Sequence, residues 1–183
     1  VQLQVHSTRR TGWSVANGHI DLAIIGGQLP PELENLLQIT PYATDELALV
    51  LPSTHKLSKA KELAKEDLYK LSFVSLDSQS TTRKVVDKLL KNSGLDIQRL
   101  KIEMELNSLE AIKNAVQSGL GAAFLPVVSI ERELASGTIH KPSMSDLGVN
   151  RELKLITNPS RYTSKASEAF KRDILPQFSS FKN

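Results

Sequence analysis

Residues 71–94 read LSFVSLDSQSTTRKVVDKLLKNSG, and this stretch decides the fold class. The apolar residues of Leu71–Leu76 predict a strand, and the hydroxyl-bearing segment Ser78–Thr82 follows it closely. The next residues predict a helix, because apolar side chains recur on one face: Val85, Val86, Leu89 and Leu90. Gly94 stands where this helix should end, since glycine readily takes the backbone conformation of a helix C-terminus. A strand that turns into a helix is the building unit of α/β proteins.

The rest of the chain repeats this alternation of strand-like and helix-like segments. We expect further strands over residues 1–5, 20–25, 46–51, 101–106, 122–125 and 152–157. We expect further helices from the Ser7–Thr8 turn to about Gly18, over 57–70, after Asn107 or Ser108, around 130–134, and over 164–178. The sequence therefore predicts an α/β fold with a mostly parallel sheet.

The composition is that of an ordinary globular protein and argues against several classes of function. Among the 183 residues, 40% are hydrophobic and 23% are charged, and no apolar run is long enough to span a bilayer. The absence of cysteine excludes disulfides, Fe–S clusters and thiolate chemistry. The net charge is only +3, and acidic residues interrupt the basic clusters at 56–70 and 84–91. We therefore interpret these clusters as solvated helix faces rather than as a DNA-contacting patch.

No residue pattern indicates catalysis or metal binding. The histidines show no pair at the i, i+4 spacing of a helical metal site: His6, His19, His55 and His140. The segment Gly119-Leu120-Gly121 lacks the third glycine of a dinucleotide site, and we interpret it as close backbone packing where a helix turns into a strand. Adjacency does not make Asp45 and Glu46 an acid/base pair, because consecutive strand residues point to opposite faces. We predict no metal, no cofactor and no enzymatic activity.

A strand followed by hydroxyl residues, a helix start and arginine occurs twice. The first copy is Ser7-Thr8-Arg9-Arg10, and the second is Ser78-Gln79-Ser80-Thr81-Thr82-Arg83. A helix start offers unpaired N–H groups and a partial positive charge, which suit a carboxylate or phosphate. Two such ends facing a common cleft would hold a small dianion. The alternative is that each hydroxyl merely caps its helix and each arginine is solvated.

Several short motifs, in order along the chain, resemble the sensing domains of LysR-type transcriptional regulators. Asn17–Ile25 is similar to that family's "G-x-I/L-D-L-A-I" core, and residues 52–57 are similar to "P-x-x-H-P-L", with Lys56 replacing the usual proline. Ser108–Lys113 through Gly119–Pro126 is similar to the segment "V-x-x-G-x-G-(I/A)-(A/T)-(F/L)-(L/V)-P". Residues 8–11 and 13–18 resemble more closely the cyanobacterial and plastid branch that regulates carbon-fixation and inorganic-carbon-uptake genes.

The resemblance implies two Rossmann-like lobes as in type 2 periplasmic binding proteins, joined by two crossover strands that act as a hinge. Lobe I would comprise residues 1–72 plus 153–183, and lobe II residues 73–152. Family pocket positions fall on Ser7 and Thr8, on Ser78–Thr81, and on Leu125-Pro126. With neighbouring residues added, the predicted ligand-binding set is His6, Ser7, Thr8, Ser78, Gln79, Ser80, Thr81, Arg83, Leu125 and Pro126.

The implied partners are a small anionic effector and further copies of the chain. For the carbon-related branch the effectors would be phosphorylated or dicarboxylic metabolites, such as ribulose bisphosphate, phosphoglycolate or 2-oxoglutarate. The family forms dimers and tetramers in the cytoplasm or plastid stroma, without a membrane anchor, and contacts DNA through an N-terminal helix-turn-helix. In the family a further strand, helix and pocket loop also precede the position of Val1. Since this chain shows neither part, we expect residues 1–183 to have an incomplete pocket and to bind effector weakly or not at all.

Two other functions fit parts of the pattern. A solute-binding protein of an importer would share the fold and the cleft. An enzyme of phosphate-ester metabolism would share the anion site, but no base, nucleophile or metal ligand stands out in the sequence.

Overall fold

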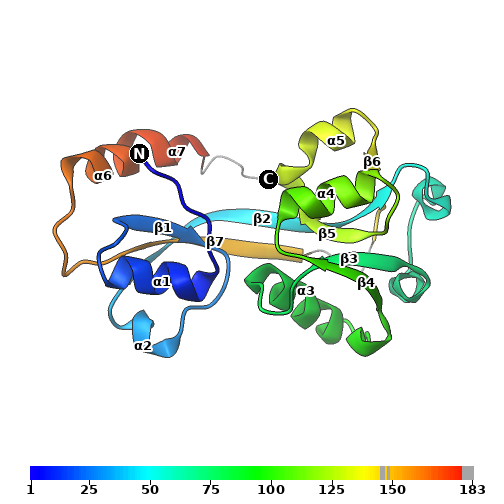
Figure 1. The fold of residues 1–183 in the computed structure, drawn as a ribbon, viewed down its shortest axis with the longest axis horizontal. Coiled ribbons are helices and arrows are strands. Elements are labelled where there is room, and N and C mark those ends of the chain that lie inside the picture. The colour runs from blue at the N-terminus through cyan, green and yellow to red at the C-terminus, as the bar shows by residue number, and fades with distance from the viewer. Residues whose placement is uncertain (145–146, 148, 179–183) are drawn as a thin grey trace. The chain divides into compact units, whose positions relative to one another are not determined.

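The computed structural model describes residues 1–144, 147 and 149–178, and it is a mixed α/β structure (Figure 1). Its strands are β1 (Leu22–Ile25), β2 (Gln38–Pro52), β3 (Ser72–Leu76), β4 (Lys101–Leu106), β5 (Ala123–Pro126), β6 (Ile139–His140) and β7 (Val149–Thr157). Its α-helices are α1 (Thr8–Ala16), α2 (Pro31–Glu34), α3 (Thr81–Asn92), α4 (Leu109–Gln117), α5 (Glu131–Ala135), α6 (Lys165–Ala169) and α7 (Leu175–Phe178). Short 3₁₀ helices are η1 (Lys56–Lys59), η2 (Lys65–Lys70), η3 (Ile97–Arg99) and η4 (Val127–Ser129), and η5 (Phe170–Ile174) is a π-helix.

The chain divides into two compact units. Unit 1 comprises Val1–Asp45 with Arg151–Asn183, and unit 2 comprises Glu46–Asn150. Residues 46–72, expected in lobe I with the terminal segments, pack in unit 2, because Leu49 and Leu68 are buried in one cluster with Phe73. The second boundary lies close to the expected one. Residues 145, 146, 148 and 179–183, which the expected lobes included, lie outside the described part of the chain.

The strand pairing corrects the expectation of a mostly parallel sheet. One sheet has the order β1-β7-β2-β5, with β6 also paired to β2, and the registers of β1 with β7 and of β2 with β5 and β6 are antiparallel. Parallel pairing joins β3 to β4, and a parallel bridge joins Phe73 to Ala122. The sequence pattern enforces parallel pairing only where one helix connects two neighbouring strands, as α3 does between β3 and β4. Strands that are distant in sequence are free to pair antiparallel.

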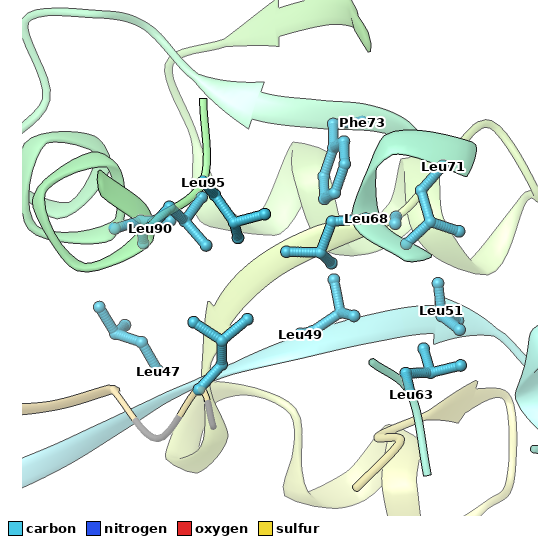
Figure 2. Close-up of a cluster of buried hydrophobic side chains, with 12 residues drawn as sticks. Leu47, Leu49, Leu51, Leu63, Leu68, Leu71, Phe73, Leu90 and Leu95 are labelled. Carbon is cyan, nitrogen blue, oxygen red and sulfur yellow. The ribbon is translucent and has the colours of Figure 1, made fainter. Parts of the chain in front are cut away.

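The core of unit 2 lies on both faces of its strands. Leu47, Leu49 and Leu51 of β2 join one buried cluster, whereas Val50 joins another. Figure 2 shows the first cluster, in which Leu68 lies between Leu49 and Phe73. Alternate strand residues point to opposite faces, so a continuous apolar run is buried on both sides. This accounts for the unbroken apolar sequence of residues 47–51.

The core of unit 1 is formed by α1, β1 and the segment around α2. Its buried members are Val15, Ile25, Leu29, Leu33, Leu37 and Ile156. Gly12 permits the close approach of α1 to this segment, because an added β-carbon would lie 2.6 Å from Leu29 Cδ2. The packing holds the start of α1 in a defined position.

The expected terminal helix over 164–178 is confirmed, with a widened turn in the middle. Ser164 caps it by accepting a hydrogen bond from the N–H of Ser167 at 3.1 Å. The π-helical turn η5 directly precedes Leu175 and Pro176. Proline has no N–H and its ring crowds the carbonyl of the residue four positions earlier, so Pro176 explains why the turn widens.

Two expected elements differ from the structure. Residues 1–5 do not form a strand: Val1, Leu3 and Val5 are 109%, 87% and 86% exposed. An alternating segment becomes a strand only where it pairs with a neighbour, and the described residues provide none there. The expected helix over 57–70 is two 3₁₀ turns, η1 and η2, because Leu63 between them donates its N–H to the carbonyl of Ser143.

Candidate functional site

The first candidate helix start lies in unit 1, where α1 begins. Ser7 is its N-cap residue, and the Ser7 hydroxyl oxygen accepts a hydrogen bond from the N–H of Arg10 at 3.5 Å. Thr8 is only 4% exposed, so most of its side chain lies in the interior of unit 1. No acidic residue stands in the first turn of α1. The helix dipole and the backbone N–H groups therefore give this end a partial positive charge that no acid of the turn offsets.

A hollow of about 350 Å³ lies beside α1. Arg9, Arg10, Trp13 and His19 contribute to its lining next to Ser7, and no acidic side chain of the described residues lines it. Arg9, Arg10 and Trp13 are exposed. The lining extends along α1 from its N-cap Ser7 to its C-cap Asn17. A negatively charged group bound there would meet the guanidinium groups of Arg9 and Arg10 and no carboxylate of the described lining residues.

The second candidate helix start lies in unit 2, where β3 runs into α3. Ser80 is the N-cap residue, and its hydroxyl oxygen accepts a hydrogen bond from the N–H of Arg83 at 3.5 Å. The preceding turn is closed by Asp77, whose carboxylate accepts the N–H of Gln79 at 2.9 Å. Ser78 and Gln79 are exposed, and Thr81 is half-buried. The first turn of α3 also lacks an acidic residue.

Arg83 is held within unit 2 by several acceptors. Its Nε donates to Asp87 at 2.8 Å, and its Nη1 donates to the hydroxyl of Ser75 at 2.8 Å and to the carbonyl of Leu76 at 3.1 Å. Nη1 also lies 3.4 Å from Glu105. Arg83 therefore connects the beginning of α3 to the end of β3, and much of its donor capacity is used inside the unit. Its role as a ligand contact stays a prediction.

The remaining predicted residues lie in different surroundings. Leu125 is fully buried in the core of unit 2, and both Leu125 and Pro126 pair with β2. The Pro126 carbonyl accepts a hydrogen bond from the Ser129 hydroxyl at 2.7 Å. His6 is exposed, and its Nε2 lies 3.3 Å from Gln4 Oε1. Ser7 and Thr8 are thus gathered in unit 1 and Ser78–Thr81 in unit 2, each group at its own helix start.

The helix α4 shows what distinguishes these two helix starts. Among the described helices of nine residues or more, α1, α3 and α4, only α4 carries an acid in its first turn. There Ser108 accepts the N–H of Ala111 at 3.4 Å, and Glu110 provides the negative charge that favours a helix start. An external anion is therefore better suited to α1 and α3 than to α4.

Two other sequence interpretations are confirmed. A β-carbon added at Gly121 would lie 2.7 Å from the carbonyl oxygen of Ser72, so the glycine segment does mark close backbone packing. Asp45 and Glu46 bind different partners, Arg151 and Lys141, and so do not act as a pair. The described residues contain no group of three or more potential metal ligands, and none of their helices is long and apolar enough to cross a membrane.

Sequence reasoning missed the ion pair between Asp45 and Arg151. Arg151 Nη2 lies 2.6 Å from Asp45 Oδ2, and the two residues are 106 positions apart in the chain. No local pattern could have indicated it. The hollow beside α1 was also missed, although Trp13 and His19 stand close to the predicted Ser7 in sequence.

Comparison with known proteins gives consistent results. The family profile described as "LysR substrate binding domain" matches residues 1–179. A protein of Synechocystis sp. named probable RuBisCO transcriptional regulator is 62% identical over 179 residues, which are 98% of this chain and 52% of the relative. A protein of the same name from Porphyra purpurea is 59% identical over 178 residues, 97% of this chain and 56% of the relative. The chain thus spans about half the length of these relatives.

Solved structures of lower identity share the fold. The regulatory domain of Synechocystis CcmR, solved in complex with 2-PG, matches with a TM-score of 0.81 and 22% identity, covering 99% of this chain and 84% of that one. The effector-binding domain of QuiR, solved with shikimate, matches with a TM-score of 0.77 and 23% identity, covering 95% of this chain and 78% of that one.

Proposed function

We propose that this chain, which belongs to the LysR substrate binding domain family, is the part of a transcriptional regulator that binds a small anionic metabolite. Binding of this metabolite would change the activity of the regulator. The preference for an anion is supported by the two helix starts at Ser7 and Ser80. Each of them is capped by a serine hydroxyl and has no acidic residue in its first turn. Helix starts of this kind stabilise carboxylates and phosphates through backbone N–H groups and the helix dipole. Arg9 and Arg10 add positive charge beside the first.

A phosphorylated or dicarboxylic metabolite is the proposed effector. Each of the two units has one such helix start, and each helix start suits a carboxylate or a phosphate group. The complex of CcmR with 2-PG and the names of the carbon-related relatives support this class. Binding would act by favouring one arrangement of the units over the other, since a ligand shifts such an equilibrium only through its different affinity for the two states.

The wider role follows the names of the relatives. They are called transcriptional regulators, so we assign sensing and no chemical turnover to this chain. DNA contact is assigned to a part of the regulator outside residues 1–183, because the basic residues here are mixed with acids and form no continuous stripe. We further propose that the protein acts as a dimer or tetramer in the cytoplasm or plastid stroma.

Calorimetric titration tests the proposal. The chain is titrated with 2-phosphoglycolate and 2-oxoglutarate as anionic ligands, and with glycerol as an uncharged control. The variant Ser80→Ala/Thr81→Val removes two hydroxyls at the start of α3 and should weaken anion binding. The matched control is Ser108→Ala, which removes the N-cap hydroxyl of α4 in the same unit. Binding that is lost equally in both variants, or that does not distinguish anions from glycerol, would contradict the proposed site.

A further inference from the structure

The chain passes between its two units at two points. It leaves unit 1 between Asp45 and Glu46 and returns between Asn150 and Arg151. Both points lie inside strands, β2 and β7, which are neighbours in one sheet (Figure 1). Any change in the arrangement of the units must therefore involve the backbone at these two points.

A buried ion pair joins the two strands next to both crossing points. The Nε and Nη2 atoms of Arg151 donate to the same carboxylate oxygen of Asp45, at 2.8 and 2.6 Å. The side chains are 14% and 7% exposed. A β-carbon added at Gly26 would lie 3.2 Å from Arg151 Nη1, so the end of β1 also packs against the guanidinium group. All three residues belong to unit 1.

The next residue of β2 is bound on the other side of the crossing. Glu46 lies 2.5 Å from Lys141 Nζ, and both are residues of unit 2. Consecutive strand residues point to opposite faces, which explains why the adjacent acids Asp45 and Glu46 bind different partners. The Glu46–Lys141 pair is far more exposed, at 43% and 36%, so its attraction is weakened by solvent.

We propose that the Asp45–Arg151 pair is a pin that holds β2 and β7 together on the unit 1 side of the hinge and confines bending to the adjoining crossing points. Separating a buried ion pair leaves charges without compensation, so the two strands should move as one piece. The inference that an effector drives this hinge rests on the proposed function. The pin itself is a property of the ligand-free chain.

Single-molecule energy transfer between the units tests the pin. The chain contains no cysteine, so Glu32→Cys in unit 1 and Lys91→Cys in unit 2 provide exposed dye positions. Asp45→Asn/Arg151→Gln removes both charges together, which avoids leaving one buried and unpaired. Arg151→Lys is a milder variant that keeps the charge and loses the two-point contact. The matched control is Lys113→Gln/Glu133→Gln, which removes an ion pair with 14% exposure on both sides, within unit 2.

Without ligand, we expect the double variant to broaden the distribution of inter-dye distances. We also expect it to change the ratio of its populations by about fivefold or more, the lower end of typical conformational coupling. Arg151→Lys should give a smaller change in the same direction, and the control should leave the distribution as in the wild type. An unchanged distribution in both Arg151 variants, or an equal change in the control, overturns the pin.

A second arm adds 2-phosphoglycolate to the wild-type chain. The ligand is added at a concentration that saturates the calorimetric titration, so that weak binding is not mistaken for a missing response. A shift in the distance distribution then supports a hinge that responds to the effector, whereas an unchanged distribution of the saturated chain counts against the proposed function. The role of the Asp45–Arg151 pair is tested by the ligand-free comparison alone. A failure of this inference can therefore be distinguished from a failure of the proposed function.

Discussion

The hydroxyl of Tyr42 donates a hydrogen bond to the carbonyl oxygen of Leu175 at 2.9 Å. It connects β2 to the C-terminal helical segment, directly after the widened turn η5. Burial raises the pKa of Tyr42 above its ordinary value of 10.0, so the hydroxyl keeps its proton, and stays a donor, to a higher pH than a solvent-exposed tyrosine would. The C-terminal segment is therefore attached to unit 1 by a specific polar contact as well as by packing.

Removing this hydroxyl should loosen the C-terminal segment. We expect Tyr42→Phe to lower the free energy of unfolding by about 0.5–1.5 kcal/mol, the usual worth of one hydrogen bond. Urea denaturation measures the loss, and hydrogen exchange should localise it to residues 165–178. Tyr162→Phe is the control, because Tyr162 is 85% exposed. Equal effects of the two substitutions would show that the Tyr42 contact contributes nothing specific.

Gly121 should tolerate substitution poorly. An alanine there would place its β-carbon 2.7 Å from the backbone oxygen of Ser72, so strand β3 would have to move. We expect Gly121→Ala to cost about 2–3 kcal/mol, in the upper part of the range for overpacking. Gly137→Ala should cost about 1 kcal/mol, because Gly137 has a positive φ of 70° but no atom near the new β-carbon. Chemical denaturation of both variants compares them, and the reverse order would refute the packing argument.

Two serines of the C-terminal helix should respond in opposite directions. The hydroxyl oxygen of Ser167 is buried and has no hydrogen-bond partner among the described residues, so Ser167→Ala should be neutral or stabilise by up to about 1 kcal/mol. Ser164 caps the helix, so Ser164→Ala should destabilise by about 1 kcal/mol. Thermal and urea unfolding measure both. A loss of stability in Ser167→Ala would show that its hydroxyl has a partner in solution.

The stability of the chain should fall in acid partly through Asp67. The hydrogen bond from Lys70 at 2.8 Å, together with the N–H of Ala64, holds the pKa of Asp67 below its ordinary value of 3.8. Between the two pKa values the unfolded chain binds more protons, so this contribution is present above the unfolded value and is lost as the pH falls through the folded one. We expect Asp67→Asn and Lys70→Gln to flatten the decline of unfolding free energy below about pH 5. An unchanged slope in both variants would exclude this contribution.

Local features of the fold were predictable from the sequence. The N-cap residues Ser7, Ser80, Ser108 and Ser164 all lie where hydroxyl residues precede apolar periodicity. Capping depends on atoms within a few residues of each other, so a short stretch of sequence contains the whole interaction. The same holds for Gly121, whose small size indicated a close backbone approach before the neighbouring strand was known.

Features that join distant residues were not predictable in this way. The sequence pattern for β2 began at Glu46, yet the strand starts at Gln38. The alternation of strands and helices along the chain predicted a mostly parallel sheet, but β1 and β7 pair antiparallel. Strand partners are selected by the burial of the whole core, which no single segment contains.

By itself, the sequence determined most of the longer strands and helices, the hydroxyl-capped helix starts and the resemblance to the family, because these depend on neighbours along the chain. Only the tertiary structure decided that Leu49 packs in unit 2, that β1 pairs with β7, and that Asp45 pairs with Arg151. Contacts between distant residues form only when folding brings them together, and their partners are chosen by the free energy of burying the entire core and its few charges.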